Sequence, residues 1–162
     1  MHTCSHDTVD LRSASSLSIG RRHFLKIASL GTGAVVFLSR APAAHAVSKA
    51  DTLLLTCIDY RLADDIHKFM DSKGMTDNYD HVILAGASAG AISEAFAQWH
   101  DTFWSHLDVA IDLHGITKVI IMDHRDCGAY KIAYGAEHAA DPATETALHT
   151  KVMGELAAAI RE

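Results

Sequence analysis

Basic residues are scarce in most of this chain. The first 46 residues hold five of the 14 Lys and Arg residues and two of the 20 Asp and Glu residues. Residues 47–162 therefore carry nine bases against 18 acids, a net charge of about −9 with neutral histidine. Nucleic acids and anionic membrane surfaces both attract basic protein surfaces. The composition argues against either as a partner of residues 47–162.

Cysteine is also scarce, with three in the whole chain. Cys4 lies near the N-terminus, which leaves Cys57 and Cys127 in the rest of the sequence. In an oxidising compartment, two cysteines indicate one disulfide. Two cysteines with a nearby histidine can instead bind a metal ion. Both interpretations remain open at this point.

No hydrophobic run is long enough to cross a membrane. The longest near the N-terminus, residues 27–38, has about a dozen residues, whereas a membrane-spanning helix needs about 20. It follows Arg21 and Arg22 and precedes the small residues "AHA" at 44–46. This order resembles a twin-arginine export signal, although Gly20 stands where Ser or Thr is usual.

We therefore predict a signal peptide at residues 1–46, cleaved after Ala46, and a periplasmic protein made of residues 47–162. The alternative is an uncleaved hydrophobic helix or anchor. The length allows one domain after the leader, and the sequence has no internal repeat and no low-complexity linker there.

Three short apolar runs, each bounded by polar or glycine residues, predict strands that are buried on both faces. Apolar residues at helical spacing fill the intervening segments and the C-terminal segment. This alternation predicts an α/β fold with a parallel β-sheet core flanked by helices. The runs are residues 53–55, 82–84 and 119–122, and the helical segments are residues 61–74, 88–115 and 143–162.

Polar or glycine residues stand where each predicted strand ends, at Cys57, Gly86 and His124. Parallel sheets bind ligands at the carboxyl ends of their strands, so these residues are candidates for one site. Gly86 and Gly90 lack the Lys-Ser/Thr of a phosphate loop and predict a tight, closely packed turn.

Two short segments carry the candidate chemistry. In "CIDYR", alternation along an extended chain points Cys57, Asp59 and Arg61 to one side. In "HRDC", the three-residue interval puts His124 and Cys127 on one face of a helical turn. If the two strand ends are neighbours, two thiolates and one imidazole converge. Such a set suits Zn²⁺ and leaves a fourth position for water.

The segments C-I-D-Y-R and H-R-D-C-G resemble the two signatures of β-class carbonic anhydrases, and the resemblance covers roughly residues 53–130. It implies reversible hydration of carbon dioxide to bicarbonate by a zinc-bound hydroxide. Cys57, His124 and Cys127 would hold Zn²⁺. Asp59 would orient the hydroxide, and Arg61 would keep Asp59 off the metal. The resemblance also implies a homodimer or a higher homo-oligomer.

Several positions depart from the family pattern. Ile83 and Leu84 replace polar residues that help to build the pocket, and Asp123 stands where glycine is usual. Asp123 is interpreted either as a partner of His124 or Arg125 or as a solvated loop acid. The chain also ends before the family's last strand, which would leave an edge of the sheet unpaired.

Three alternatives follow. The same ligands suit a hydrolase of carbon disulfide or carbonyl sulfide. The departures favour a non-catalytic zinc-binding protein. A Cys57–Cys127 disulfide would leave Asp59 and Arg61 as a surface ion pair, but it would not explain His124. The remaining histidines, His149 among them, lack ligand spacing, and we expect most of them to be exposed.

Overall fold

The structure is a computed structural model that describes residues 4–10 and 50–162. Its strands are β1 (Cys4–Asp10), β2 (Thr52–Thr56), β3 (Tyr79–Ile83) and β4 (Lys118–His124). Its longer helices are α1 (Ala63–Ser72), α3 (His100–His114) and α5 (Pro142–Arg161). Shorter helical segments are α2 (Ser88–Ile92), η3 (Glu94–Trp99), α4 (Gly128–Tyr134) and η4 (Ala136–Ala139). Apart from β1, the predicted signal peptide lies outside the described residues.

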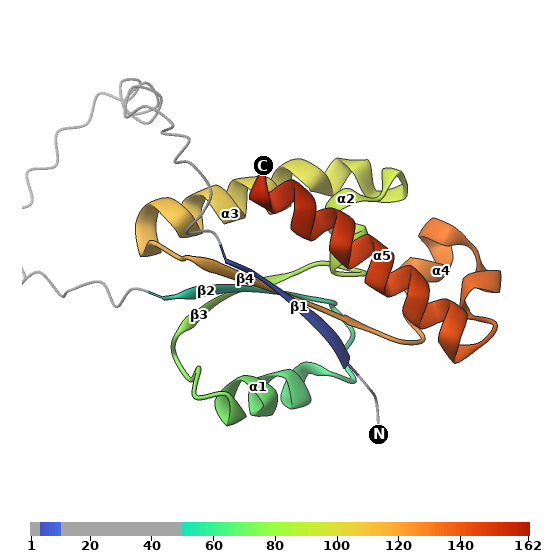
Figure 1. Cartoon of the computed structure of the whole chain (residues 1–162), viewed down its shortest axis with the longest axis horizontal. Helices are drawn as coiled ribbons and strands as arrows, with labels where there is room; N and C mark the ends of the chain where they lie inside the picture. The colour runs from blue at the N-terminus through green and yellow to red at the C-terminus, as the bar shows by residue number, and fades with distance from the viewer. Residues whose placement is uncertain (1–3, 11–49) are drawn as a thin grey trace, which may run out of the picture.

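The strands form one sheet in the order β1-β4-β2-β3 (Figure 1). β2 lies in the middle and pairs in parallel with β3 and with β4; Leu55 is opposite Val82 on one side and Ile121 on the other. Helices cover both faces of this three-stranded parallel core. The predicted α/β fold is confirmed.

The far edge of β4 pairs with β1, which runs antiparallel to it. β1 comes from the segment that we assign to the signal peptide, and no strand was predicted there. The edge of β4, which we expected to be unpaired, is therefore paired with β1 in the described part of the chain. The boundary between signal peptide and domain stays a prediction, and cleavage after Ala46 would remove β1.

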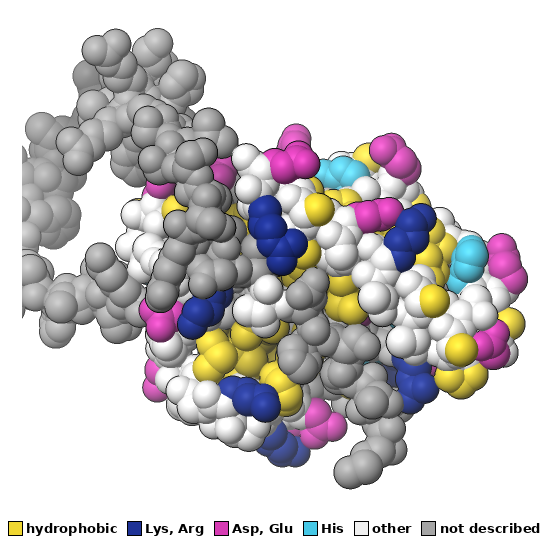
Figure 2. Space-filling view, viewed as in Figure 1, with side chains coloured by type: hydrophobic (Ala, Val, Ile, Leu, Met, Phe, Trp, Pro, Cys, Tyr) yellow, Lys and Arg dark blue, Asp and Glu magenta, His cyan; other side chains and the backbone are white. Residues whose placement is uncertain are grey.

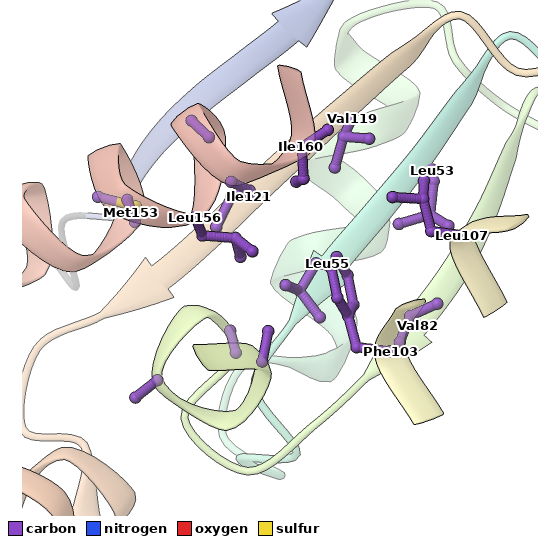
Figure 3. Close-up of a cluster of buried hydrophobic side chains, with 14 of the residues drawn as sticks. Leu53, Leu55, Val82, Phe103, Leu107, Val119, Ile121, Met153, Leu156 and Ile160 are labelled. Carbon is purple, nitrogen blue, oxygen red and sulfur yellow. The ribbon is translucent and has the colours of Figure 1, made fainter. Parts of the chain in front are cut away.

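The sheet separates two hydrophobic clusters because successive side chains of a strand point to opposite faces. Leu54 faces α1 and packs with Ile66 and Met70. Leu53 and Leu55 face the larger cluster, which α2, α3 and α5 cover (Figure 1). Figure 3 shows that larger cluster, in which side chains of β2, β3 and β4 meet those of α3 and α5.

The segment at residues 88–115, which was predicted to be helical, divides into α2, η3 and α3. Ser93 causes the first break: its backbone is extended, with ψ 135°, and its side chain accepts a hydrogen bond from the Ala95 amide. The C-terminal end of α3 lies where the sequence predicts it, because Gly115 terminates the helix in the left-handed conformation with φ 70°.

The connections that leave β2 and β4 diverge. β2 leads into α1 on one face, whereas β4 leads through α4 into α5 on the other (Figure 1). Diverging connections leave a crevice between the carboxyl ends of two neighbouring parallel strands, where ligands of α/β proteins bind.

No helix in the described part of the chain is long and apolar enough to cross a membrane. On the face in Figure 2, lysine and arginine side chains lie scattered among acidic ones, without gathering into a basic patch of described residues.

Candidate metal centre

The adjacent carboxyl ends of β2 and β4 bring together the three residues that the sequence proposes as ligands. Cys57 directly follows β2, His124 is the last residue of β4, and Cys127 is the N-cap of α4. One side-chain donor atom of each lies within 4.8 Å of the others, and all three residues are buried. Segments that are 67 or more residues apart in sequence thus meet because β2 and β4 are adjacent in the sheet.

The two sulfur atoms are spaced for a shared ion. Cys57 Sγ and Cys127 Sγ lie 3.9 Å apart, and both cysteines are free thiols. A disulfide would require about 2.05 Å between the sulfurs. Two thiolates on a tetrahedral Zn²⁺ at about 2.3 Å each are about 3.8 Å apart. The observed spacing matches the metal site and not the disulfide.

His124 supplies a ring nitrogen, Nε2, that makes no hydrogen bond within the described residues. Its Nδ1 donates to the Arg125 carbonyl oxygen at 2.9 Å, which leaves the lone pair on Nε2. Nε2 is buried and has no hydrogen-bond partner among the described residues. Buried polar atoms are normally satisfied, so an orphaned imidazole nitrogen next to two thiols fits a metal ligand. The donor set of two sulfurs and one nitrogen is the set expected for Zn²⁺.

The thiols share one negative charge. The hydrogen bond from Cys127 is the main cause that lowers the pKa of Cys57, with His124 and the Gly86 amide adding to it. The Gly86 amide donates to Cys57 Sγ at 3.3 Å. The neighbouring Cys57 thiolate and burial raise the pKa of Cys127. Without a metal the pair therefore holds one proton, whereas a divalent cation would hold both cysteines as thiolates.

Asp59 and Arg61 form a two-pronged ion pair beside the ligands. Arg61 Nη2 donates to Asp59 Oδ2 at 2.6 Å, and Arg61 Nε donates to Oδ1 at 2.9 Å. These hydrogen bonds hold the pKa of Asp59 well below its usual range, so it stays a carboxylate. Asp59 Oδ2 lies 3.7 Å from His124 Nε2, which puts a second anion at the edge of the donor cluster.

Asp126 fixes the far side of Arg61. Its carbonyl accepts a hydrogen bond from Arg61 Nη2 at 3.4 Å, and its carboxylate lies 3.5 Å from Arg61 Nη1. Asp126 also pairs with Lys131 and has a positive φ of 58°, which aspartate tolerates better than most residues. The contacts between Arg61 and Asp126 thus link the "CIDYR" segment to the "HRDC" segment that carries His124 and Cys127.

Asp123 is not the solvated loop acid that was one of its two predicted roles, because its side chain is 1% exposed. Among the described residues, it makes no hydrogen bond with the His124 side chain. Its carboxylate accepts hydrogen bonds from Ser88, Tyr130 and His149. The cause is tertiary: β4 carries Asp123 into a space that three helices close.

The turn after β3 contains a motif that is also found in serine hydrolases. Gly86-Ala87-Ser88-Ala89-Gly90 fits G-x-S-x-G between a strand and a helix, and Asp123 and His149 follow in the chain order of α/β-hydrolase triads. In a triad, the serine donates to the histidine. Here Ser88 is fully buried and its Oγ bonds to Asp123 itself. Ser88 is therefore no triad nucleophile. Gly86 lies in the predicted tight turn with φ +78°, whereas Gly90 lies in α2, where an added Cβ would come within 2.6 Å of the Ala85 carbonyl oxygen.

His149 is the residue that sequence reasoning missed. It was expected to be exposed with most other histidines, yet its side chain is 3% exposed. A signal was available, because His149 begins the buried stripe of α5 that continues through Val152, Leu156 and Ile160. A polar residue at a core position of a helix requires a buried partner.

The departures at Ile83 and Leu84 have different outcomes. Leu84 is partly buried and packs against the larger hydrophobic cluster, whereas Ile83 is 51% exposed. Neither supplies a polar group to the site.

The comparisons with known proteins point to one family. The family described as "Putative carbonic anhydrase" matches residues 47–154. An uncharacterized protein of Rickettsia conorii is 37% identical over 116 residues, which are 72% of this chain and 62% of that protein. An uncharacterized protein of Rickettsia bellii is 36% identical over 116 residues and is covered to 71%. No solved structure gives a significant match.

Proposed function

The chain belongs to the "Putative carbonic anhydrase" family, and on that premise we propose that it is a zinc-dependent lyase of the β-class type that hydrates carbon dioxide reversibly to bicarbonate. The observation that carries the proposal is the buried cluster of Cys57, His124 and Cys127. These three residues would hold Zn²⁺, which would supply a hydroxide at neutral pH by lowering the pKa of a coordinated water toward ~7.

Asp59 is the residue that we propose to act on the reacting oxygen. Its carboxylate lies next to the donor atoms, with Oδ2 3.7 Å from His124 Nε2, so it would accept a hydrogen bond from a hydroxyl group at the metal and orient that group toward carbon dioxide. Arg61 occupies both carboxylate oxygens and so opposes direct ligation of the metal by Asp59. Fixing the attacking group in this way reduces the entropy cost of the reaction.

Zinc content and carbon dioxide hydration, measured on the same purified protein, test this function. We expect one zinc ion per chain and hydration that Asp59→Asn reduces while the zinc remains bound. A folded, zinc-loaded protein without hydration activity would instead support the non-catalytic alternative. A protein without zinc and without free thiols would support the Cys57–Cys127 disulfide.

The ligand set does not distinguish carbon dioxide from other small linear electrophiles. Carbon disulfide and carbonyl sulfide are therefore assayed beside carbon dioxide, and the substrate with the highest kcat/KM identifies the reaction.

We also propose that the protein is exported by the twin-arginine pathway and cleaved after Ala46. Two observations support this: the Arg21-Arg22 pair before a short apolar run, and a family match that begins at residue 47. N-terminal sequencing of the protein from a periplasmic extract tests the boundary, and a start well before Val47 would contradict it.

A further inference from the structure

Four side chains outside the donor cluster form a buried polar group, which we call the Asp123 cluster: Asp123, Ser88, Tyr130 and His149. Their exposed fractions are between 0% and 4%. They come from β4, α2, α4 and α5 respectively, so the cluster joins four elements.

Asp123 is the common acceptor of the cluster. Its Oδ1 accepts from the Ser88 amide at 3.1 Å. Its Oδ2 accepts from Ser88 Oγ at 2.5 Å, from the Tyr130 hydroxyl at 2.6 Å and from His149 Nδ1 at 3.2 Å. Burial, together with the charge of Asp123, raises the pKa of Tyr130, so its hydroxyl keeps its proton and stays a donor. A buried carboxylate is tolerated only when it is hydrogen-bonded in this manner.

Three of the four members of the cluster, Asp123, Tyr130 and Ser88, are close in the chain to a proposed ligand or to a group that contacts one. Asp123 directly precedes His124 on β4. Tyr130 lies in the first turn of α4, the helix whose N-cap is Cys127. Ser88 belongs to the turn whose Gly86 amide donates to Cys57 Sγ.

The turn at Ser88 is strained. Ala87, which is fully buried, has φ 42° and ψ −102°, a conformation that L-residues rarely adopt. Such a conformation persists only where surrounding contacts hold it, and it is common at functional sites. The two hydrogen bonds from Ser88 to Asp123 directly follow the strained residue and hold the turn in place.

We propose that the Asp123 cluster sets the relative positions of Cys57, His124 and Cys127, and that His149 is the positioning residue that ties them to the C-terminal helix α5. The inference rests on the proposed metal site. Metal ligands must be held within about 0.5 Å of the productive geometry, and residues behind the ligands provide that restraint.

The second ring nitrogen of His149, Nε2, has no hydrogen-bond partner among the described residues. The imidazole borders a cavity of about 10 Å³ that Cys127 also lines, which is room for one water molecule.

The test compares four variants of the full chain. His149→Leu removes the donor to Asp123, whereas His149→Asn keeps an amide donor near the position of Nδ1. Tyr130→Phe keeps the ring and removes only the hydroxyl. His106→Leu is the matched control, because His106 is exposed on α3 and its hydrogen bond within the described part of the chain goes to the Thr102 carbonyl.

The readouts are the Kd for Zn²⁺, measured by competition with a chelating dye, and the visible absorption spectrum of the Co²⁺-loaded protein, which reports ligand geometry. We expect His149→Leu and Tyr130→Phe to weaken Zn²⁺ binding by about 10–100-fold and to shift the Co²⁺ bands. We expect His149→Asn to recover most of the affinity and His106→Leu to match the wild type.

Unchanged Zn²⁺ affinity and an unchanged Co²⁺ spectrum in His149→Leu and Tyr130→Phe would overturn the inference. It would also be overturned by a lower unfolding temperature with an unchanged spectrum, because that is the result of a purely structural role. If His149→Leu does not fold, Tyr130→Phe decides. A wild type that binds neither ion would refute the proposed metal site itself, and the inference with it.

Discussion

Arg61 donates hydrogen bonds to both carboxylate oxygens of Asp59, with Nη2 2.6 Å from Oδ2 and Nε 2.9 Å from Oδ1. The pair is only partly exposed, and Asp126 braces the guanidinium from the other side. A two-pronged pair fixes the direction of the carboxylate as well as its charge. The orientation of Asp59 toward the ligands is therefore set by Arg61.

The first prediction separates the roles of these two residues. Asp59→Asn keeps the shape of the side chain and removes its charge, so we expect kcat/KM for hydration to fall by about 10²–10⁴-fold with zinc still bound. Arg61→Ala releases Asp59, which lies 3.7 Å from His124 Nε2 and can then turn onto the metal. We expect a similar loss of activity without loss of zinc.

Because both changes act through Asp59, the double variant should be no worse than either single variant. Arg161→Ala, at the exposed end of α5, is the control for removal of an arginine. Full activity of Asp59→Asn would contradict the role proposed for this carboxylate.

The second prediction concerns removal of the metal. The donor atoms of Cys57, His124 and Cys127 come from distant segments and converge only in the folded chain. A metal that binds only the native state stabilises it by about 4 kcal/mol at a free concentration 1,000 times its Kd. A strong chelator should therefore lower Tm, and stoichiometric Zn²⁺ should restore it, as followed by scanning calorimetry.

Cys127→Ser is the control for this experiment, because its Tm should no longer respond to chelator or to zinc. Thiol titration of the metal-free protein in denaturant should find both Cys57 and Cys127 as free thiols. A wild-type Tm that is insensitive to zinc would argue against the site.

The third prediction is the pH dependence of metal binding. The hydrogen bond to the Cys57 thiolate, together with burial, raises the pKa of Cys127. Burial opposes charge on His124, but its contacts with Cys57 and the Arg125 carbonyl raise its pKa overall. Both groups hold protons more tightly than usual, and a metal must displace them. Zn²⁺ affinity should therefore fall as pH is lowered, by about tenfold for each displaced proton per pH unit.

Calorimetry in buffers of different ionisation enthalpy measures the number of protons released at each pH. Release of no proton at pH 7 would mean that both thiols are already ionised without the metal. That result would contradict the raised pKa of Cys127.

Local patterns predicted the parts of the fold that depend on a single element. The apolar runs located all three parallel strands, although β3 begins at Tyr79, before its apolar run, because an edge strand tolerates half-buried polar residues. The break at Ser93 depends on one side-chain hydrogen bond and leaves no periodic signal. β1, with the sequence C-S-H-D-T-V-D, has no continuous apolar run to mark it as a strand.

The candidate site divides in the same manner. Cys57, His124 and Cys127 were predictable because each stands at a strand end with recognisable spacing. Asp123 and His149 were not, since their partners lie on other elements and only the packed fold makes them neighbours. His149 shows the limit most clearly: its position in the apolar stripe of α5 indicates burial, but nothing in its own helix indicates what it bonds to.

The last prediction uses two glycines in opposite environments. Gly86 has φ +78°, and a Cβ placed there would lie 3.0 Å from Ala129 Cβ. Gly86→Ala therefore combines backbone strain with a close contact, and we expect it to destabilise the fold by roughly 1–3 kcal/mol. It should also weaken metal binding, because the Gly86 amide donates to Cys57 Sγ.

Gly154 lies in α5 with no atom within 4 Å of an added Cβ, so Gly154→Ala should stabilise the fold by about 0.5–1 kcal/mol. Urea unfolding of both variants measures the difference, and equal effects of the two substitutions would show that the turn at Gly86 is not constrained in the way the structure indicates.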